Sequence, residues 1–217
     1  MKNTQTTPTQ TLLDFIKELL DESIVNNTCF TAWREPQSET VFIGLGEQLQ
    51  SKQHVFDTQK PIFVFSPFTK NKEHDYFPLD SLYEFNGNEC KTIFENQIEA
   101  QNIKIESDNQ DATTKKDYIK QVEKAIGFIN IKAFDKVVVS KVKKVKIEKG
   151  AYLTAFQSLI EELDNSFISL VYTPQAGLWL GATPELLLEK DKNQLKTVAL
   201  AGTQSNTFEN IREAFWR

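Results

Sequence analysis

The chain has 217 residues, of which 40% are hydrophobic, and a formal net charge of −5. This length allows one domain with a substantial core, and the negative charge disfavours nucleic acid as a partner, although one basic pocket would still bind a small anion. Only two cysteines, Cys29 and Cys90, are present, which excludes a disulfide scaffold or a cysteine-rich zinc site and favours a reducing, cytoplasmic location. The polar N-terminus and the short apolar runs predict neither a signal peptide nor a membrane span.

The first hundred residues predict one helix and three strands. Apolar residues recur at helical spacing across residues 12–20, which indicates an amphipathic helix. Segments with strand character lie at residues 29–34, 40–44 and 61–66. The turn sequence Glu35-Pro36-Gln37-Ser38 separates the first two, so we expect them to form a hairpin. Residues 71–105 show no regular pattern, and residues 106–116 have the composition of an exposed linker.

The second half of the chain predicts alternating strands and helices. Apolar stripes indicate two helices, one at residues 118–129 with its N-cap at Asp111, Thr113 or Thr114, and one at residues 152–163. Strands are expected at residues 136–147, 167–172, 178–181, 186–189 and 195–200. The second and third of these flank a turn and should form a hairpin. The sequence therefore predicts an α+β fold with mainly antiparallel sheets packed between helices.

Common catalytic motifs are absent from the sequence. There is no Gly-rich dinucleotide motif, no P-loop and no H-E-x-x-H segment, and His54 and His74 lie in ordinary polar surroundings. A two-histidine metal site and a histidine-based triad are therefore disfavoured. The remaining chemistry is that of lysine and carboxylate side chains.

Glu185 and Lys136 each allow two interpretations. Pro184 fixes the backbone before Glu185 and would aim the carboxylate inward, where apolar Trp179 and Leu186 would favour the protonated form of a general acid. Local sequence alone favours a solvated turn carboxylate instead. Lys136 opens a valine-rich segment, where a lysine is more often an edge gatekeeper than a base. A lysine drawn into an apolar site can nevertheless accept a proton.

A third feature is the apolar run that ends in Ala201, Gly202 and Thr203. Small side chains allow a ligand to approach backbone N–H groups closely, which suits the binding of a carboxylate. The alternative interpretation is a plain strand that ends in a turn.

Three segments in this order resemble the family of chorismate-utilising enzymes. They are F-D-K-V-V-V-S-K at residues 134–141, similar to the family's K-V-V-L-S-R strand; L-G-A-T-P-E at residues 180–185, similar to L-G-A-[ST]-P-E; and A-L-A-G-T at residues 199–203, similar to L-A-G-T. The resemblance is close from residue 118 to about residue 204. It implies that residues 1–110 are the less distinctive N-terminal part of one domain, and that residues 111–217 begin its chorismate-binding catalytic region.

The resemblance implies a fold of the anthranilate synthase type that acts on chorismate with Mg²⁺. Lys136 would be the general base that activates water for attack at C2, and Glu185 the general acid that protonates the departing C4 hydroxyl, giving isochorismate. Ala201, Gly202 and Thr203 would contact a substrate carboxylate through backbone N–H groups. Lys136 and Leu200 argue against relatives that use ammonia, whereas a salicylate-forming relative shares both catalytic residues and stays open.

The family's acidic Mg²⁺ ligands lie further along the chain than its L-A-G-T segment. The resemblance therefore implies no metal ligand within this sequence and ligands beyond Arg217, because Glu209 and Glu213 do not match the family's metal motif. We accordingly expect the N-terminal portion of such an enzyme, with a non-catalytic relative as the alternative. The residues do not distinguish menaquinone, siderophore and salicylate pathways, and they do not indicate an oligomeric state.

Overall fold

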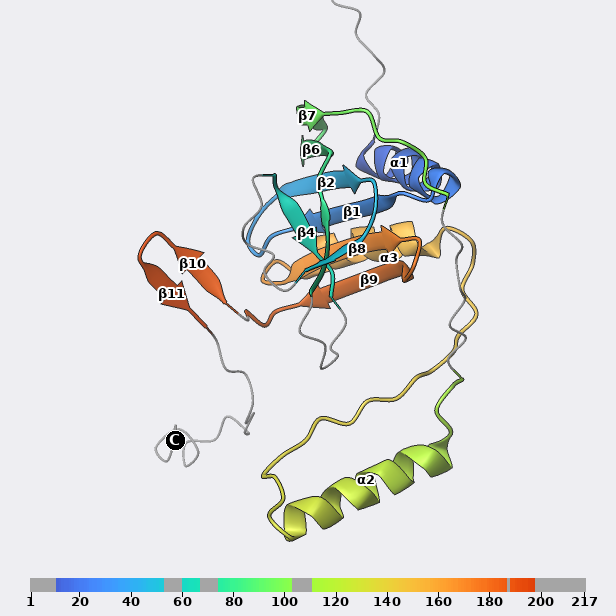
Figure 1. Cartoon of the computed structure of the whole chain (residues 1–217), viewed down its shortest axis with the longest axis vertical. Helices are drawn as coiled ribbons and strands as arrows, with labels where there is room; N and C mark the ends of the chain where they lie inside the picture. Colours follow the sequence, from blue (N-terminus) through green and yellow to red (C-terminus); the bar gives the residue numbers. More distant parts are fainter. Residues whose placement is uncertain (1–10, 53–59, 67–73, 103–110, 187, 198–217) are drawn as a thin grey trace, which may run out of the picture. The chain divides into compact units, whose positions relative to one another are not determined.

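The computed structural model describes residues 11–52, 60–66, 74–102, 111–186 and 188–197 (Figure 1). The chain divides into two compact units, one of residues 1–103 and 152–217 and the other of residues 104–151. Every strand pair in the described part is antiparallel, and helices accompany the sheets, so the predicted α+β class is confirmed. The predicted functional division after residue 110 stays a prediction.

A six-stranded sheet is the centre of the first unit (Figure 1). In spatial order its strands are β7 (Glu89–Glu95), β6 (Ser81–Asn86), β2 (Thr40–Gly46), β1 (Cys29–Arg34), β8 (Phe167–Thr173) and β9 (Gly177–Thr183). Both predicted hairpins, β1–β2 and β8–β9, are confirmed. They meet where β1 pairs with β8, which places β9 at one edge of the sheet.

Three strands occur in residues 71–105, where the sequence showed no pattern. They are β5 (His74–Pro78), β6 and β7. In β6 the buried side chains are Ser81, Tyr83 and Phe85. One of the three buried positions is therefore a polar serine, which weakens the alternation of apolar and polar residues in the sequence. Strand β7 is almost wholly exposed at the other edge of the sheet, and for that reason it carries no burial signal in its sequence.

Two helices cover one face of this sheet, α1 (Leu12–Asn26) and α3 (Ala151–Glu162), both as predicted. The Thr11 hydroxyl caps α1 by accepting a hydrogen bond from the Asp14 backbone N–H at 3.2 Å. Ile16, Leu20 and Phe156 are fully buried against apolar side chains of the sheet: Phe30, Ala32, Val41, Ile43, Tyr83, Phe85, Ile168, Leu170 and Tyr172. This cluster is the larger of the two cores.

A three-stranded sheet packs on the opposite face, with the order β3 (Gln50–Lys52), β5, β4 (Ile62–Val64). The strand predicted at residues 61–66 is thus confirmed over a shorter range. Phe77 and Leu79 are buried here with Cys29 and Val171 from the larger sheet. Successive residues of one strand point to opposite faces, so Leu170 lies in the helix-covered core and Val171 in this second core.

The second unit contains α2 (Lys115–Asn130), which confirms the predicted second helix and its N-cap region. The Thr114 hydroxyl accepts a hydrogen bond from the Asp117 N–H at 3.1 Å. None of the helix's side chains is buried in the described part of the chain, so its apolar stripe lies exposed.

The strand predicted at residues 136–147 is wrong. These residues form no ladder with any described strand. Among the described residues, their backbone is linked at Val142, whose C=O accepts from the Thr113 N–H at 2.8 Å and whose N–H donates to the Thr113 hydroxyl at 2.9 Å. Strand propensity measures packing on a half-buried, paired surface rather than a preference of the isolated backbone. Valine-rich composition alone was therefore not sufficient to make these residues a strand. The lysine side chains of the segment are exposed.

The last predicted strands are displaced from their expected positions. Strand β10 (Glu189–Asp191) pairs with β11 (Gln194–Lys196) in a short hairpin whose turn contains Lys192 at a φ of 44°. Leu186 lies outside any strand, and residues 187 and 198–200 lie outside the described residues. The turn chemistry of Lys192-Asn193 was not recognised, and it decides where these strands begin and end. No helix in the described ranges is long and apolar enough to cross a membrane.

Candidate functional site

Glu185 lies two residues past the end of β9. Its backbone N–H donates to the Thr183 hydroxyl at 3.2 Å, and Pro184 stands between the two residues. The bond and the proline ring restrict the backbone that leads to the carboxylate. The Glu185 side chain itself is exposed, so the described residues do not enclose it in apolar surroundings.

Lys136 lies in the second unit and is also exposed. The segment that carries it runs beside α2: the Phe134 ring lies 5.9 Å from the Phe128 ring, and the Lys141 ammonium lies 5.4 Å from the centre of the Tyr118 ring. Lys141, which stands where the family more often has arginine, thus makes a cation–π contact here. These contacts attach the segment to α2 on both sides of Lys136.

The predicted site residues fall in different parts of the chain. Lys136 belongs to one unit and Glu185 to the other. Ala201, Gly202 and Thr203 lie outside the described residues. The roles of all five residues therefore stay predictions.

The described part of the chain offers no metal centre. No three His, Cys, Asp or Glu side chains within it lie close enough together to hold a metal ion, so these residues do not fit Mg²⁺. Burial raises the pKa of both cysteine thiols. Burial raises the pKa of Cys29 to about 12, which disfavours its thiolate, and Cys90 is exposed on the edge strand β7.

A surface that the sequence interpretation missed lies on β9, directly before Glu185. Trp179, Gly181 and Thr183 lie on one face of this edge strand, opposite Val171, Ser169 and Phe167 of β8. Trp179 is 56% exposed, although its indole N–H donates to the Ala176 carbonyl at 2.8 Å and its ring meets Phe65 at 6.0 Å. The alternate spacing of these three residues before the L-G-A-T-P-E glutamate was the signal available in the sequence.

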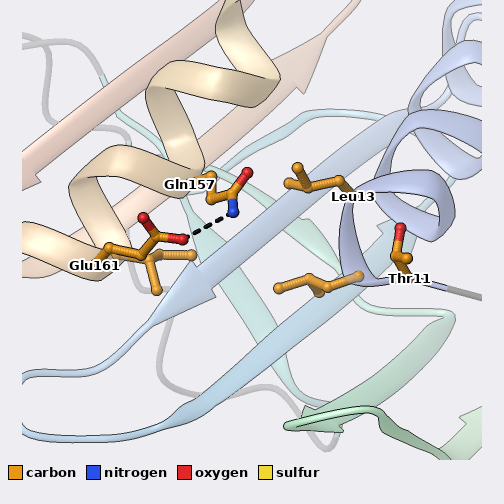
Figure 2. Close-up of a pocket in the computed structure, with 6 residues that line it drawn as sticks. Thr11, Leu13, Gln157 and Glu161 are labelled. Carbon is orange, nitrogen blue, oxygen red and sulfur yellow. Dashed lines mark hydrogen bonds between the residues drawn. The ribbon is translucent and has the colours of Figure 1, made fainter.

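The pocket in Figure 2 lies on the helix-covered side of the sheet, between α1 and α3. Its volume is about 340 Å³, and it is lined by Thr11, Leu12, Leu13, Gln157, Ile160 and Glu161. Its polar groups are already engaged: the Gln157 amide donates to the Glu161 carboxylate at 2.7 Å, and the Thr11 hydroxyl caps α1. Neither Lys136 nor Glu185 is among these six lining residues, and none of the six is a cation.

Comparison with known proteins found one family. The model of a family described as chorismate binding enzyme matches residues 78–213, which is more than half of the 217 residues. The match begins at the last residue of β5 and includes Lys136, Glu185 and residues 201–203. No curated protein and no solved structure matched the chain significantly.

Proposed function

Because the chain belongs to the chorismate-binding enzyme family, whose members act on chorismate, we propose that it is an isochorismate synthase. The observation that carries this choice within the family is the lysine at position 136 in the segment F-D-K-V-V-V-S-K. Members that activate water resemble this chain at that position, whereas members that use ammonia do not.

In the proposed reaction, water attacks C2 of chorismate, both ring double bonds shift, from C1=C2 to C1=C6 and from C5=C6 to C4=C5, and the C4–O bond breaks so that the hydroxyl departs as water. Lys136 removes the proton from the attacking water and must therefore be neutral beforehand. Glu185 donates a proton to the departing hydroxyl and must therefore be protonated beforehand. One proton is taken up at Lys136 and one is given up at Glu185, so the reaction is balanced overall.

The neutral form of Lys136 and the protonated form of Glu185 both require surroundings with less water than those of exposed side chains. Lys136 and Glu185 are exposed in the described part of the chain. Removal of water favours a neutral lysine and a protonated glutamate alike, since each is the uncharged form. The proposal therefore requires that the bound substrate and the parts of the protein around it enclose the two side chains.

Mg²⁺ is proposed as the cofactor on the resemblance alone, because the described residues provide no acidic cluster for it. No step of the proposed reaction is assigned to the ion. Its requirement is tested by turnover with and without a chelator, followed by restoration with Mg²⁺.

The decisive experiment is chorismate turnover by the full chain, with products separated by chromatography. Lys136→Ala and Glu185→Gln should each abolish turnover. Lys143→Ala and Glu162→Gln are matched controls, because they change an exposed lysine of the same segment and an exposed glutamate at the end of α3. Full activity in either of the first two variants would refute the assignment, and salicylate with pyruvate as products would identify the salicylate-forming alternative.

A second candidate is a chorismate-binding protein without catalysis. The exposure of the Lys136 and Glu185 side chains favours it. It predicts that the wild-type chain binds chorismate, releases no product and loses no affinity in Glu185→Gln.

A further inference from the structure

We propose that Trp179 and Gly181 position the ring of chorismate. The ring packs against the Trp179 indole and lies over Gly181, which has no side chain. This inference rests on chorismate as the substrate of the proposed function and adds the residues that orient it. It concerns the face of β9 that leads directly to Glu185. Gly181 and Thr183 belong to the L-G-A-T-P-E segment, in which the resemblance assigns a role only to the glutamate.

Trp179 is exposed and yet held at two points. Its indole N–H donates to the Ala176 carbonyl at 2.8 Å, and its ring meets the Phe65 ring at 6.0 Å with an interplanar angle of 61°. More than half of its surface, 56%, remains exposed. A large ring with fixed orientation loses little conformational entropy when a ligand packs against it, which makes such a side chain suited to recognition.

Gly181 leaves the position next to this ring bare. Among the described residues, a Cβ built there would meet only the Ser169 hydroxyl oxygen at 3.8 Å, which is an ordinary contact, so neither their packing nor a left-handed backbone requires glycine. Ser169 itself is small and half-buried, and it lies opposite Trp33 of β1. Trp33, Ser169 and Gly181 therefore lie in one row across three neighbouring strands, and Trp179 lies two residues before Gly181 on the same face of β9.

The spacing suits a six-membered ring. Residues two apart on a strand are separated by about 6.8 Å, so a ring above Gly181 fits between the side chains of Trp179 and Thr183. The Thr183 hydroxyl holds the backbone N–H of Glu185, and this brings the proposed acid directly after the position of the ring. The apolar ring of chorismate would pack on the indole while its carboxylates stay free for other groups.

The test is a binding titration of the full chain with chorismate, followed by tryptophan fluorescence excited at the red edge of the indole band. Chorismate should quench the wild-type emission, and Trp179→Phe should remove most of the quenching while it keeps the affinity. Trp179→Leu should weaken binding about three- to tenfold, the range expected for loss of one ring contact. Its effect on turnover should be in KM rather than in kcat.

Gly181→Ala is the more specific test, because the added methyl group fits the described structure and would clash only with a ligand bound at this position. It should weaken binding at least as much as Trp179→Leu, with an unchanged urea midpoint. Gly127→Ala is the matched control, since a Cβ there meets nothing within 4 Å on the exposed helix α2.

Wild-type affinity in both Gly181→Ala and Trp179→Leu would overturn the inference, as would a wild-type chain that fails to bind chorismate. Binding that depends on both residues without formation of isochorismate would support the inference and refute only the proposed reaction.

Discussion

Gly46→Ala tests how the two sheets pack against each other. Gly46 ends β2, and a Cβ at this position would lie 2.3 Å from the Pro78 carbonyl oxygen and 2.9 Å from the Phe77 ring. Phe77 is fully buried, and a backbone carbonyl cannot rotate away, so β5 has to move. Overpacking costs about 1–3 kcal/mol in general, and we expect about 3 kcal/mol here because one contact is with the backbone.

The assay is urea unfolding followed by tryptophan fluorescence, since Trp33 and Trp179 both belong to the first unit. With a slope of about 3 kcal/mol per molar urea, the midpoint should fall by about 1 M. Gly181→Ala carries the same substitution to a site where the added methyl meets only the Ser169 hydroxyl, and its midpoint should not change. Equal midpoints for the two variants would refute the packing described for Gly46.

Four further predictions use the same unfolding assay or thiol chemistry. Phe156→Ala should lower the free energy of unfolding by about 3–5 kcal/mol, because Phe156 is fully buried in the helix-covered core, whereas Val25→Ala, at a side chain 79% exposed, should change it by less than about 0.5 kcal/mol. Thr31→Val should raise stability by about 1 kcal/mol, since the buried Thr31 hydroxyl has no hydrogen-bond partner among the described residues; a loss of stability would reveal such a partner. Burial raises the pKa of the Cys29 thiol from 9.0 to about 12, so the folded chain keeps a proton that the unfolded chain releases, and stability should fall from about pH 9 to about pH 12 with a smaller slope in Cys29→Ala. At pH 8 a thiol reagent should modify Cys90 in the native chain and both cysteines only after denaturation.

Local patterns in the sequence were sufficient for most of the helices and hairpins. The apolar spacing of residues 12–20 identified α1, and the hydroxyls that precede Asp14 and Asp117 by three residues form the caps of α1 and α2. The hairpins β1–β2 and β8–β9 followed from turn residues between two apolar runs. Each of these features depends on residues close together in the chain.

The candidate site likewise has residues that the sequence proposed and a surface that only the structure showed. Lys136 and Glu185 were proposed from their residue type and their motif, and their exposure agrees with the solvated alternative that the local sequence also offered. The face of Trp179 and Gly181 became apparent only when Ser169 was found opposite the glycine and Phe65 against the indole. Such neighbours come from other strands, and no short window of sequence contains them.

The sequence by itself determined the three helices of the described part of the chain, the N-cap region of α2, the two hairpins and the family of the chain, because propensity, periodicity and motifs depend on residues a few positions apart. Only the tertiary structure decided that β1 pairs with β8, that polar β7 joins the sheet, and that valine-rich residues 136–147 form no strand with the described residues. A strand exists through hydrogen bonds to a partner that the chain supplies from far away, so its presence is a property of the pair and not of the segment.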